Sequence, residues 1–220
     1  MPHFDIGYFK KNTNRKIISK NRDIRNKITA WNLDKQYYDG KRENGYGGFN
    51  YDGRWLKLLP KIIKRYKLNS QSKVLDIGCK KGFLIFDLKK LIPGIKVFGI
   101  ENHEYPIKKS NLKIRNKIFL KNYYDLKNFR NNQFDLVIGF NSIYMQNLGD
   151  IIKTLKGIER ISKNSYVSLA SYVKKKEREK FLDWTLLGTT ILTKTEWKKV
   201  FKIIGFNGDY YFSDAGKLNL

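Results

Sequence analysis

Short apolar runs alternate with amphipathic stretches from residue 56 to near the end of the chain. Runs of strand length predict strands at 74–78, 96–101, 118–120, 134–141, 166–171 and 206–212. Apolar residues at helical spacing predict helices at 56–66, 83–91, 105–112, 151–161 and 196–204, and the charged residues 174–180 indicate the start of another. For the last helix, Thr195 is a suitable N-cap and Gly205 a suitable end. Alternating elements with strands that are apolar almost throughout indicate a doubly wound, mostly parallel α/β sheet.

The first 55 residues follow neither pattern. Residues 1–30 are strongly basic, and Ile17, Ile18, Ile24 and Ile28 are spaced in a way that fits either a short helix or a mobile arm. Residues 31–55 alternate aromatics and glycines with charges, and so many glycines preclude a regular helix. We therefore divide the chain into a basic N-terminal extension with an ordered aromatic, glycine-rich loop (1–55) and a folded domain (56–220).

The net charge of +25 at pH 7 is the most unusual feature of the composition. Such a charge points to an anionic partner, for example RNA or a nucleotide-linked substrate. Lysine greatly outnumbers arginine, however, and biased codon usage in an AT-rich genome would give the same profile with lysines on solvated faces. Arginine is the better signature of specific phosphate recognition, because its planar fork donates bidentately. We slightly favour the compositional explanation.

Cysteine, histidine and long apolar runs are scarce. A single cysteine excludes an intrachain disulfide, and two histidines without paired spacing argue against a metal site. We find no secretory signal and no apolar run of membrane-spanning length in the sequence. We therefore expect a soluble, cytoplasmic protein without a metal.

The most informative segment lies directly after the first predicted strand. Residues 76–82 read Asp-Ile-Gly-Cys-Lys-Lys-Gly and open the helix at 83–91. A glycine there lets the backbone approach a ligand, and ligands of open α/β sheets bind at this edge. About 20 residues further on, the second strand ends in Glu101, whose carboxylate is placed to bind both hydroxyls of a ribose. A dehydrogenase is a poor alternative, because the spacing is not Gly-x-Gly-x-x-Gly.

With these features in register, residues 72–212 resemble the class I, Rossmann-like S-adenosylmethionine-dependent methyltransferases. The resemblance implies that the turn holds the methionine part of S-adenosylmethionine, that Glu101 holds the ribose, and that Asp125 binds the adenine amine. The fourth strand then ends beside the cofactor and faces the substrate. The cofactor-binding residues expected on this basis are Asp76, Gly78, Cys79, Gly82, Glu101, Asn102, Tyr124, Asp125 and Asn141.

The sequence departs from this family at two places. Lys80 replaces a small residue that is often present in the glycine-rich turn. The antiparallel hairpin usual at the end of the sheet looks incomplete, because only about eight residues follow Phe212.

Residues 46–55 have a second resemblance. They are similar to a Tyr-Gly-Gly-Tyr-x-Tyr-Asp-Gly-Arg-Trp segment that precedes the core of some bacterial methyltransferases. We predict that this segment is a lid over the active site, with Tyr46, Tyr51 and Arg54 binding the substrate. The alternative is that its aromatics only seal the open edge of the sheet.

The expected reaction is methyl transfer to an oxygen or nitrogen of a small molecule, such as a sugar or a nucleotide-linked sugar. Such enzymes need at most one base, and the candidates are Tyr144, His103 and Asp52. Two alternatives remain. One is an RNA methyltransferase with a basic N-terminal arm, although residues 141–144 lack the prolines of an Asn-Pro-Pro-Tyr tetrad. The other is a catalytically silent cofactor-binding module. A homodimer is also open.

Overall fold

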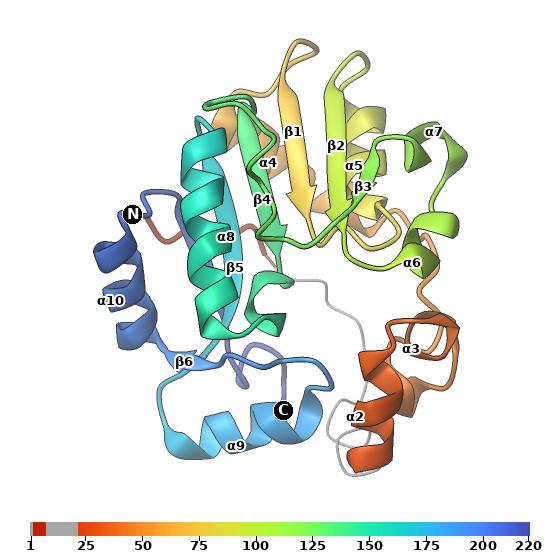
Figure 1. Cartoon of the computed structure of the whole chain (residues 1–220), viewed down its shortest axis with the longest axis vertical. Coiled ribbons are helices and arrows are strands. Elements are labelled where there is room, and N and C mark those ends of the chain that lie inside the picture. The colour runs from red at the N-terminus through yellow and green to blue at the C-terminus, as the bar shows by residue number, and fades with distance from the viewer. Residues whose placement is uncertain (1, 8–21) are drawn as a thin grey trace.

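A sheet of seven parallel-paired strands runs through the computed structural model, which describes residues 2–7 and 22–220 (Figure 1). Its order is β3-β2-β1-β4-β5, and β5 pairs with β7 along residues 166–170 and with β6 at residues 171–172. The strands are β1 (Lys73–Ile77), β2 (Lys96–Glu101), β3 (Ile118–Leu120), β4 (Leu136–Phe140), β5 (Ser165–Tyr172), β6 (Leu192–Thr193) and β7 (Asp209–Ser213). This confirms the predicted fold class.

Helices cover both faces of the sheet, with α8 in front of it and α4 and α5 behind it in Figure 1. The α-helices are α2 (Ile24–Trp31), α3 (Lys35–Asp39), α4 (Leu59–Tyr66), α5 (Phe83–Leu91), α6 (Glu104–Lys108), α7 (Leu112–Arg115), α8 (Leu148–Ile161), α9 (Lys175–Trp184) and α10 (Lys194–Ile204). Short 3₁₀ turns are η1 (Arg42–Asn44), η2 (Arg54–Lys57) and η3 (Ile143–Met145).

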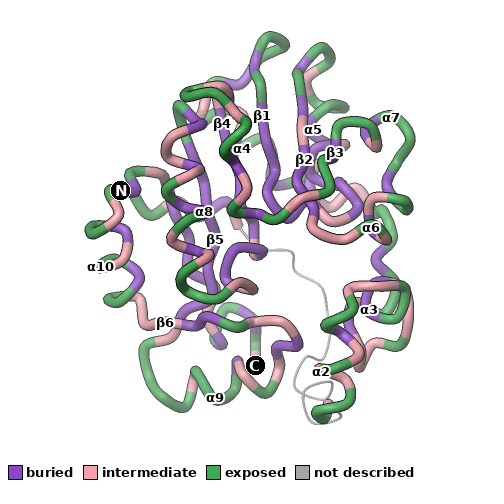
Figure 2. Tube along the Cα trace, in the orientation of Figure 1, coloured by how far each residue is buried: buried purple, intermediate pink, exposed green. Residues whose placement is uncertain are grey.

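Neighbouring residues of each central strand enter opposite cores, because successive side chains point to opposite faces. In β1, Val74 packs with α4 and α5, while Leu75 packs with α8 and α10. Both residues are fully buried, and Figure 2 shows burial along the central strands. The near-continuous apolar strands of the sequence therefore reflect two cores rather than one.

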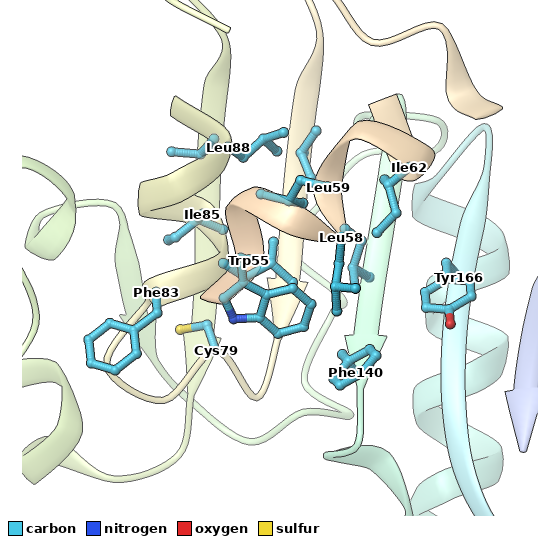
Figure 3. Packing of buried hydrophobic residues seen from close by; sticks show 14 of the residues in the cluster. Trp55, Leu58, Leu59, Ile62, Cys79, Phe83, Ile85, Leu88, Phe140 and Tyr166 are labelled. Atoms are coloured by element: carbon cyan, nitrogen blue, oxygen red, sulfur yellow. The ribbon is translucent and has the colours of Figure 1, made fainter. Parts of the chain in front are cut away.

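Residues 22–55 are more regular than the sequence suggested. Residues 24–31 form a helix, which settles the choice between helix and mobile arm for that stretch, whereas Ile17 and Ile18 lie outside the described residues. A further short helix, α3, precedes the glycines, so the expectation of one irregular loop was wrong for residues 35–39. Phe49 packs into the same core as α4 and α5. Trp55 does so too, and Figure 3 shows it beside residues of both helices. The division of the chain at residue 55 stays a prediction.

One expectation for the C-terminal third was wrong. Thr193, not Thr195, caps α10: its hydroxyl accepts from Glu196 N at 3.1 Å and Glu196 accepts from Thr193 N at 2.7 Å. The antiparallel hairpin that looked incomplete in the sequence is not formed by the described residues, where β7 pairs with β5 in parallel. Residues 2–4 extend the edge beyond β7, since Phe4 N donates to Tyr210 O at 2.9 Å.

Leu155 of α8 offers a test of the core on the α8 face, because its side chain is completely buried. Leu155→Ala should lower the free energy of unfolding by about 2–5 kcal/mol, the usual cost of emptying such a site. For a chain of this length the melting temperature should fall by roughly 5–20 °C. Lys156→Ala, at the exposed neighbouring position, is the control and should change it by no more than about 2 °C. Equal effects of the two substitutions would contradict this packing.

Candidate functional site

A cavity of about 260 Å³ lies at the carboxyl ends of β1 and β4, where open α/β sheets bind ligands. Its walls are the turn after β1, the end of β4 with η3, residues 184–187 after α9, and residues 37–55, which we call the strap. Of the predicted site residues, the cavity is lined by Asp76, Gly78, Cys79, Asn141, Tyr144, Tyr46 and Arg54. Outside the lining lie Gly82, Glu101, Asn102, His103, Tyr124, Asp125, Tyr51 and Asp52.

The turn after β1 is held on both sides by protein contacts. Gly78 N and Cys79 N donate to Ile100 O at 2.8 and 3.0 Å, which ties the turn to the end of β2. Gly78 has φ +72°, and a Cβ there would lie 2.3 Å from the Cβ of Ser142. Contact with Ser142 therefore excludes any side chain at residue 78, whether or not a ligand is bound.

Ser142 was not singled out from the sequence. Its side chain is fully buried, and its hydroxyl donates to Ile77 O at 2.6 Å. The last carbonyl of β1 is thereby fixed to the loop after β4. Residue types alone gave no signal for this bond, because it joins segments 65 positions apart.

Lys80 has φ +55°, a left-handed conformation that favours glycine. Its ammonium lies 5.9 Å from the centre of the Tyr46 ring. Burial alone would lower the pKa of Lys80, but Tyr46, Glu101 and Asp76 outweigh it and the pKa is raised. The lysine is therefore a permanent cation in the wall of the cavity.

Asp76 is the acidic residue that lines the cavity, and its side chain is almost fully buried. Within the described part of the chain, its carboxylate accepts no hydrogen bond. Burial raises the pKa of Asp76 to about 8; Lys80 lowers it and Glu101 raises it further. Asp76 is thus mostly neutral at pH 7, and a cation bound beside it would favour its ionised form.

Glu101 lies beside the same turn but is only 1% exposed. Its carboxylate accepts from Lys80 N and Asn102 N, both at 2.9 Å. Burial raises the pKa of Glu101, and the hydrogen bonds from these backbone groups and the charge of Lys80 partly offset the rise. The backbone of His103 donates a third hydrogen bond, which leaves one acceptor site of the carboxylate open, and the surrounding side chains cover Glu101 in this conformation.

Tyrosines surround this carboxylate. Burial, followed by the nearby charge of Glu101, raises the pKa of both Tyr38 and Tyr123 well above the usual value. Tyr123 lies 3.2 Å from a Cβ built on Gly78 and was missed in the sequence. The signal available was its position in the loop after β3, next to the predicted Tyr124 and Asp125.

Tyr124 and Asp125 themselves face other neighbours. Asp125 pairs with Lys121 at 3.4 Å, and the Tyr124 hydroxyl accepts from Asn122 Nδ2 at 3.2 Å. On the β2 side, Asn102 Oδ1 contacts His103 Nδ1 at 2.9 Å, and burial lowers the pKa of His103. Their predicted contacts with the adenine and ribose remain untested.

The strap packs on the carboxyl-end side of the sheet and lines the cavity. Phe49 stacks on Phe83 with ring centres 4.8 Å apart, and Trp55 meets Phe140 edge-on at 4.8 Å. Phe49 and Trp55 line the cavity, as do Tyr46 and Arg54, and the choice between lid and seal stays a prediction. Arg54 is paired with Asp52, Nε to Oδ1 at 2.8 Å, so that Asp52 fixes the guanidinium.

Tyr51 is directed away from the cavity. Its hydroxyl donates to Asp87 of α5 and accepts from Lys90 Nζ at 2.8 Å. These contacts anchor the strap on α5, and this conformation does not place Tyr51 against a substrate.

A buried ion pair joins the strap to the turn after β1. Lys81 Nζ donates to both carboxylate oxygens of Asp39, at 2.7 and 2.8 Å, and the Lys81 side chain is 6% exposed. Asp39 also accepts from Tyr105 Oη at 2.7 Å and from Phe49 N at 3.1 Å. Lys81 was read from the sequence only as part of the turn, and nothing there indicated its partner 42 positions away.

Tyr144 and Asn141 form the wall at the end of β4. Tyr144 is 6% exposed, and its carbonyl accepts from Thr190 N at 3.0 Å. Asn141 N donates to Ser168 Oγ at 2.8 Å, and Asn141 Oδ1 accepts from Ser168 Oγ at 2.9 Å. Of the three candidate bases, Tyr144 lies at the cavity, whereas His103 and Asp52 do not.

No cluster of three or more metal-binding side chains occurs among residues 2–7 and 22–220. Over the same residues, no helix has the length and apolar character needed to cross a membrane.

A parallel sheet with a glycine turn beside Asp76 and Glu101 is the arrangement of class I S-adenosylmethionine-dependent methyltransferases. The unpaired carboxyl of Asp76 in the cavity fits a cofactor that carries cationic groups. A family model described as a methyltransferase domain matches residues 68–207, and the chain belongs to this family. The protein is therefore an enzyme that uses S-adenosylmethionine as its cofactor.

Solved structures share this fold at low sequence identity. A Haloferax volcanii methyltransferase in complex with the Trm112 methyltransferase activator is 19% identical, with a TM-score of 0.58 over 83% of this chain and 77% of that one. A methyltransferase from Archaeoglobus fulgidus is 19% identical, with a TM-score of 0.52 over 69% of each chain. SpnF, a [4+2]-cyclase, is 15% identical, with a TM-score of 0.54 over 68% and 57%. A search of curated proteins gave no significant match.

The ion pair between Asp39 and Lys81 gives a prediction about the strap. Asp39→Asn leaves the buried Lys81 ammonium without a carboxylate and should cost about 2–3 kcal/mol, less than the 3–5 kcal/mol of a fully buried pair because Asp39 is partly exposed. Limited proteolysis should cut residues 37–55 faster in this variant. Lys35→Gln, on the exposed face of the same helix, is the control. Unchanged proteolysis would show that the pair does not hold the strap.

Proposed function

We propose that this enzyme transfers a methyl group to an oxygen or nitrogen of a small molecule held between the strap and Tyr144. The observation that carries the proposal is the set of segments that wall the cavity: the glycine turn, the strap, the end of β4 and residues 184–187 all line it. A walled cavity of this size suits a small acceptor better than a polymer, and we keep a sugar or nucleotide-linked sugar as the acceptor class.

The residues proposed to hold the cofactor come from the turn after β1 and from the ends of β2 and β4. Asp76, with the backbone at Gly78 and Cys79, would hold the methionine part, and Gly82 shapes the turn and starts α5. Glu101 and Asn102 would hold the ribose. Asn141 would contact the cofactor from the end of β4. Tyr124 and Asp125 stay predictions for the adenine, since their present contacts lie outside the cavity.

Bound S-adenosylmethionine supplies a methyl group already activated on a sulfonium. The protein then has to align the acceptor and exclude water. In this proposal Tyr144 would hydrogen-bond the acceptor and, as its phenolate, would receive the proton of the acceptor, and Arg54, oriented by Asp52, would bind a polar group of the substrate.

We propose that the strap is a lid. At about 260 Å³ the cavity lies below the usual range of about 300–1,000 Å³ for ligand pockets, and it would have to hold a cofactor and an acceptor together. Glu101 is also covered by its tyrosine neighbours. Both observations support an opening movement of residues 37–55 before the cofactor binds.

The experiment that tests the function is a methyl-transfer assay with labelled S-adenosylmethionine against three pools: small sugars and nucleotide sugars, total RNA, and a metabolite extract. Label in the small-molecule pools supports the proposal. Label in RNA alone would favour the RNA methyltransferase predicted as an alternative, and cofactor binding without label in any pool would favour the silent module. The cytoplasmic location and a homodimer stay predictions from the sequence.

Glu101→Ala tests the proposed ribose contact. The variant loses charge-assisted hydrogen bonds to the two hydroxyls, and the dissociation constant for S-adenosylmethionine should rise about 10- to 100-fold by calorimetry. Glu104→Ala, at an exposed position nearby, should bind normally. The melting temperature of each free variant separates loss of folding from loss of binding. Unchanged affinity in a folded Glu101→Ala protein would exclude the proposed contact.

Asp76 predicts a pH dependence of cofactor binding. With a pKa of about 8 in the free protein, the carboxyl is protonated at pH 6–7 and must lose a proton to pair with a cation. Affinity for S-adenosylmethionine should therefore rise between pH 6 and 8, by up to about tenfold per unit, and then level off. Calorimetry in two buffers of different ionisation enthalpy should show release of a proton.

Asp76→Asn is the matched variant for this dependence. It should bind more weakly at pH 8 and show no such rise. In the free wild-type protein the sign is opposite: the fold favours the protonated carboxyl, so the free energy of unfolding falls as pH rises from about 4 towards 8. A flat wild-type profile from pH 6 to 8 would contradict the role of Asp76.

A further inference from the structure

Two serines on neighbouring strands hold the side chain of Asn141, the residue that follows β4. Asn141 Oδ1 accepts from Ser168 Oγ of β5 at 2.9 Å and from Ser213 Oγ of β7 at 3.2 Å. Ser168 Oγ in turn accepts from Asn141 N at 2.8 Å. Because β5 and β7 lie on the opposite side of β4 from β1, the Asn141 amide leans away from the glycine turn after β1.

The two hydroxyls determine which way the amide of Asn141 is turned. Ser168 is fully buried, and its single O–H has no acceptor other than Asn141 Oδ1 among the described residues. If the amide were turned over, Nδ2 would face both hydroxyls, and the Ser168 hydrogen would lose its acceptor. A buried donor without an acceptor is unfavourable, so the carbonyl faces the serines and Nδ2 faces away from them.

Asn141 therefore offers donors, and no acceptor, to a ligand. It lines the cavity together with Ser213. Its Oδ1 accepts from two hydroxyls, which occupy both acceptor sites of a carbonyl oxygen. Within residues 2–7 and 22–220, Nδ2 donates to no protein atom. Both N–H groups of the amide are thus available to an oxygen of a bound molecule.

The backbone gives a second reason for asparagine at this position. Asn141 has φ +51°, a left-handed conformation that asparagine adopts more readily than most residues. Asn132 has the same φ of +51°, but it is exposed, and its side chain makes no hydrogen bond to the described part of the chain. The backbone conformation alone therefore does not account for the serines around Asn141, and Asn132 is a matched residue that separates the two reasons.

We propose that Asn141 determines which methyl acceptors bind, by donating from Nδ2 to an oxygen of the acceptor, and that Ser168 and Ser213 are positioning residues for its amide. The inference rests on the proposed function, because it concerns the acceptor of that same cavity. An acceptor oxygen at this point is bound whether it belongs to a carbonyl, a carboxylate or a hydroxyl. An amine there would set its own N–H groups against those of Asn141. Oxygen compounds are therefore favoured, and contact of Asn141 with the cofactor is left to its backbone.

The test uses small aromatic probes, because the acceptor is unidentified and aromatic rings line the cavity. Acetophenone carries an oxygen that only accepts, benzoate carries a carboxylate, and aniline, neutral at pH 7, carries N–H donors. Each is titrated into the ¹⁵N-labelled full chain with saturating S-adenosylhomocysteine. The side-chain N–H signals of Asn141 are identified as the pair lost in Asn141→Asp. We expect acetophenone and benzoate to shift these signals and aniline to leave them in place. Equal shifts with aniline, or no shift with either oxygen compound, would overturn the proposal.

Asn141→Asp replaces the two donors by acceptors in nearly the same shape, and aspartate also tolerates a left-handed backbone. The affinity for acetophenone should fall about tenfold or more. Asn141→Gly, which keeps the backbone free to adopt this conformation, should show the same loss if the aspartate variant does not fold. Asn132→Asp makes the same change at the exposed left-handed position and should leave the affinity unchanged. Equal losses in Asn141→Asp and Asn132→Asp would show only an effect of the added negative charge and would exclude the site.

The positioning role of the serines is tested by selectivity. Ser168→Ala and Ser213→Ala each remove one hydroxyl from Oδ1, so the amide can turn over, and the preference for acetophenone over aniline should fall about threefold or more. A merely structural role would weaken both probes alike. Ser213→Thr keeps a hydroxyl and should restore the preference. An unchanged preference in both alanine variants would contradict the positioning role.

The proposed function and this inference fail in different ways. Failure of S-adenosylmethionine and S-adenosylhomocysteine to bind would count against the proposed function, whatever the probes do. A protein that binds the cofactor but prefers aniline to acetophenone would leave the proposed function standing and overturn the role of Asn141 alone.

Discussion

The absence of a side chain at residue 78 is the constraint on which the site depends. Gly78 adopts φ +72° and backs directly onto Ser142, where a Cβ would lie 2.3 Å away. The same turn donates two hydrogen bonds to Ile100 O, and Ser142 in turn donates to Ile77 O. The ends of β1, β2 and β4 are therefore fixed to one another at a single point. Asp76, Glu101 and Tyr144 owe their relative positions to it, because each lies within three residues of that junction.

The strap is attached to this junction rather than to the sheet at large. Lys81 follows the turn directly and places its ammonium on Asp39, while Tyr105 and Phe49 add hydrogen bonds to the same carboxylate. A buried pair of this kind contributes little net stability, but breaking it by removing one partner is strongly unfavourable. It therefore acts mainly to specify where the strap sits. If the strap acts as the proposed lid, its position over the cavity would be linked to the glycine turn through Asp39.

The parts of the molecule that the sequence predicted correctly are those set by local pattern. Strand and helix periodicity depend on neighbouring residues, so β1, the glycine turn, α5 and the end of β2 at Glu101 could be located within a residue or two. Competition between similar signals produced the errors: Thr193 and Thr195 both suit an N-cap, and the one with Glu196 at N3 formed the capping box. The direction of Tyr51, which depends on Asp87 and Lys90 of α5, could not be inferred from spacing.

Site residues defined by distant partners were also beyond the sequence. Ser142, Tyr123 and Asp39 become recognisable only when segments dozens of positions apart meet. The local charge of the cavity could not be predicted from the sequence either. The sequence showed an excess of lysine over the whole chain, which we assigned mainly to composition. In the structure, arginines line the cavity together with Asp76, whose raised pKa keeps it mostly neutral at pH 7.

The charges that line the cavity would affect the proposed reaction. A bound cofactor would bring positive charge to a wall that already carries Lys80, so each ionisable group must be considered together with the others. Ionisation of Asp76 would offset this positive charge. An anion bound in the same cavity would offset it too, so ionised Asp76 and such an anion would oppose each other. The cofactor would supply an activated methyl group and would lose one positive charge when that group is transferred. Such a loss would favour the protonated form of Asp76, so that cofactor binding would be coupled to a single buried proton, through residues that the turn at Gly78 holds in place.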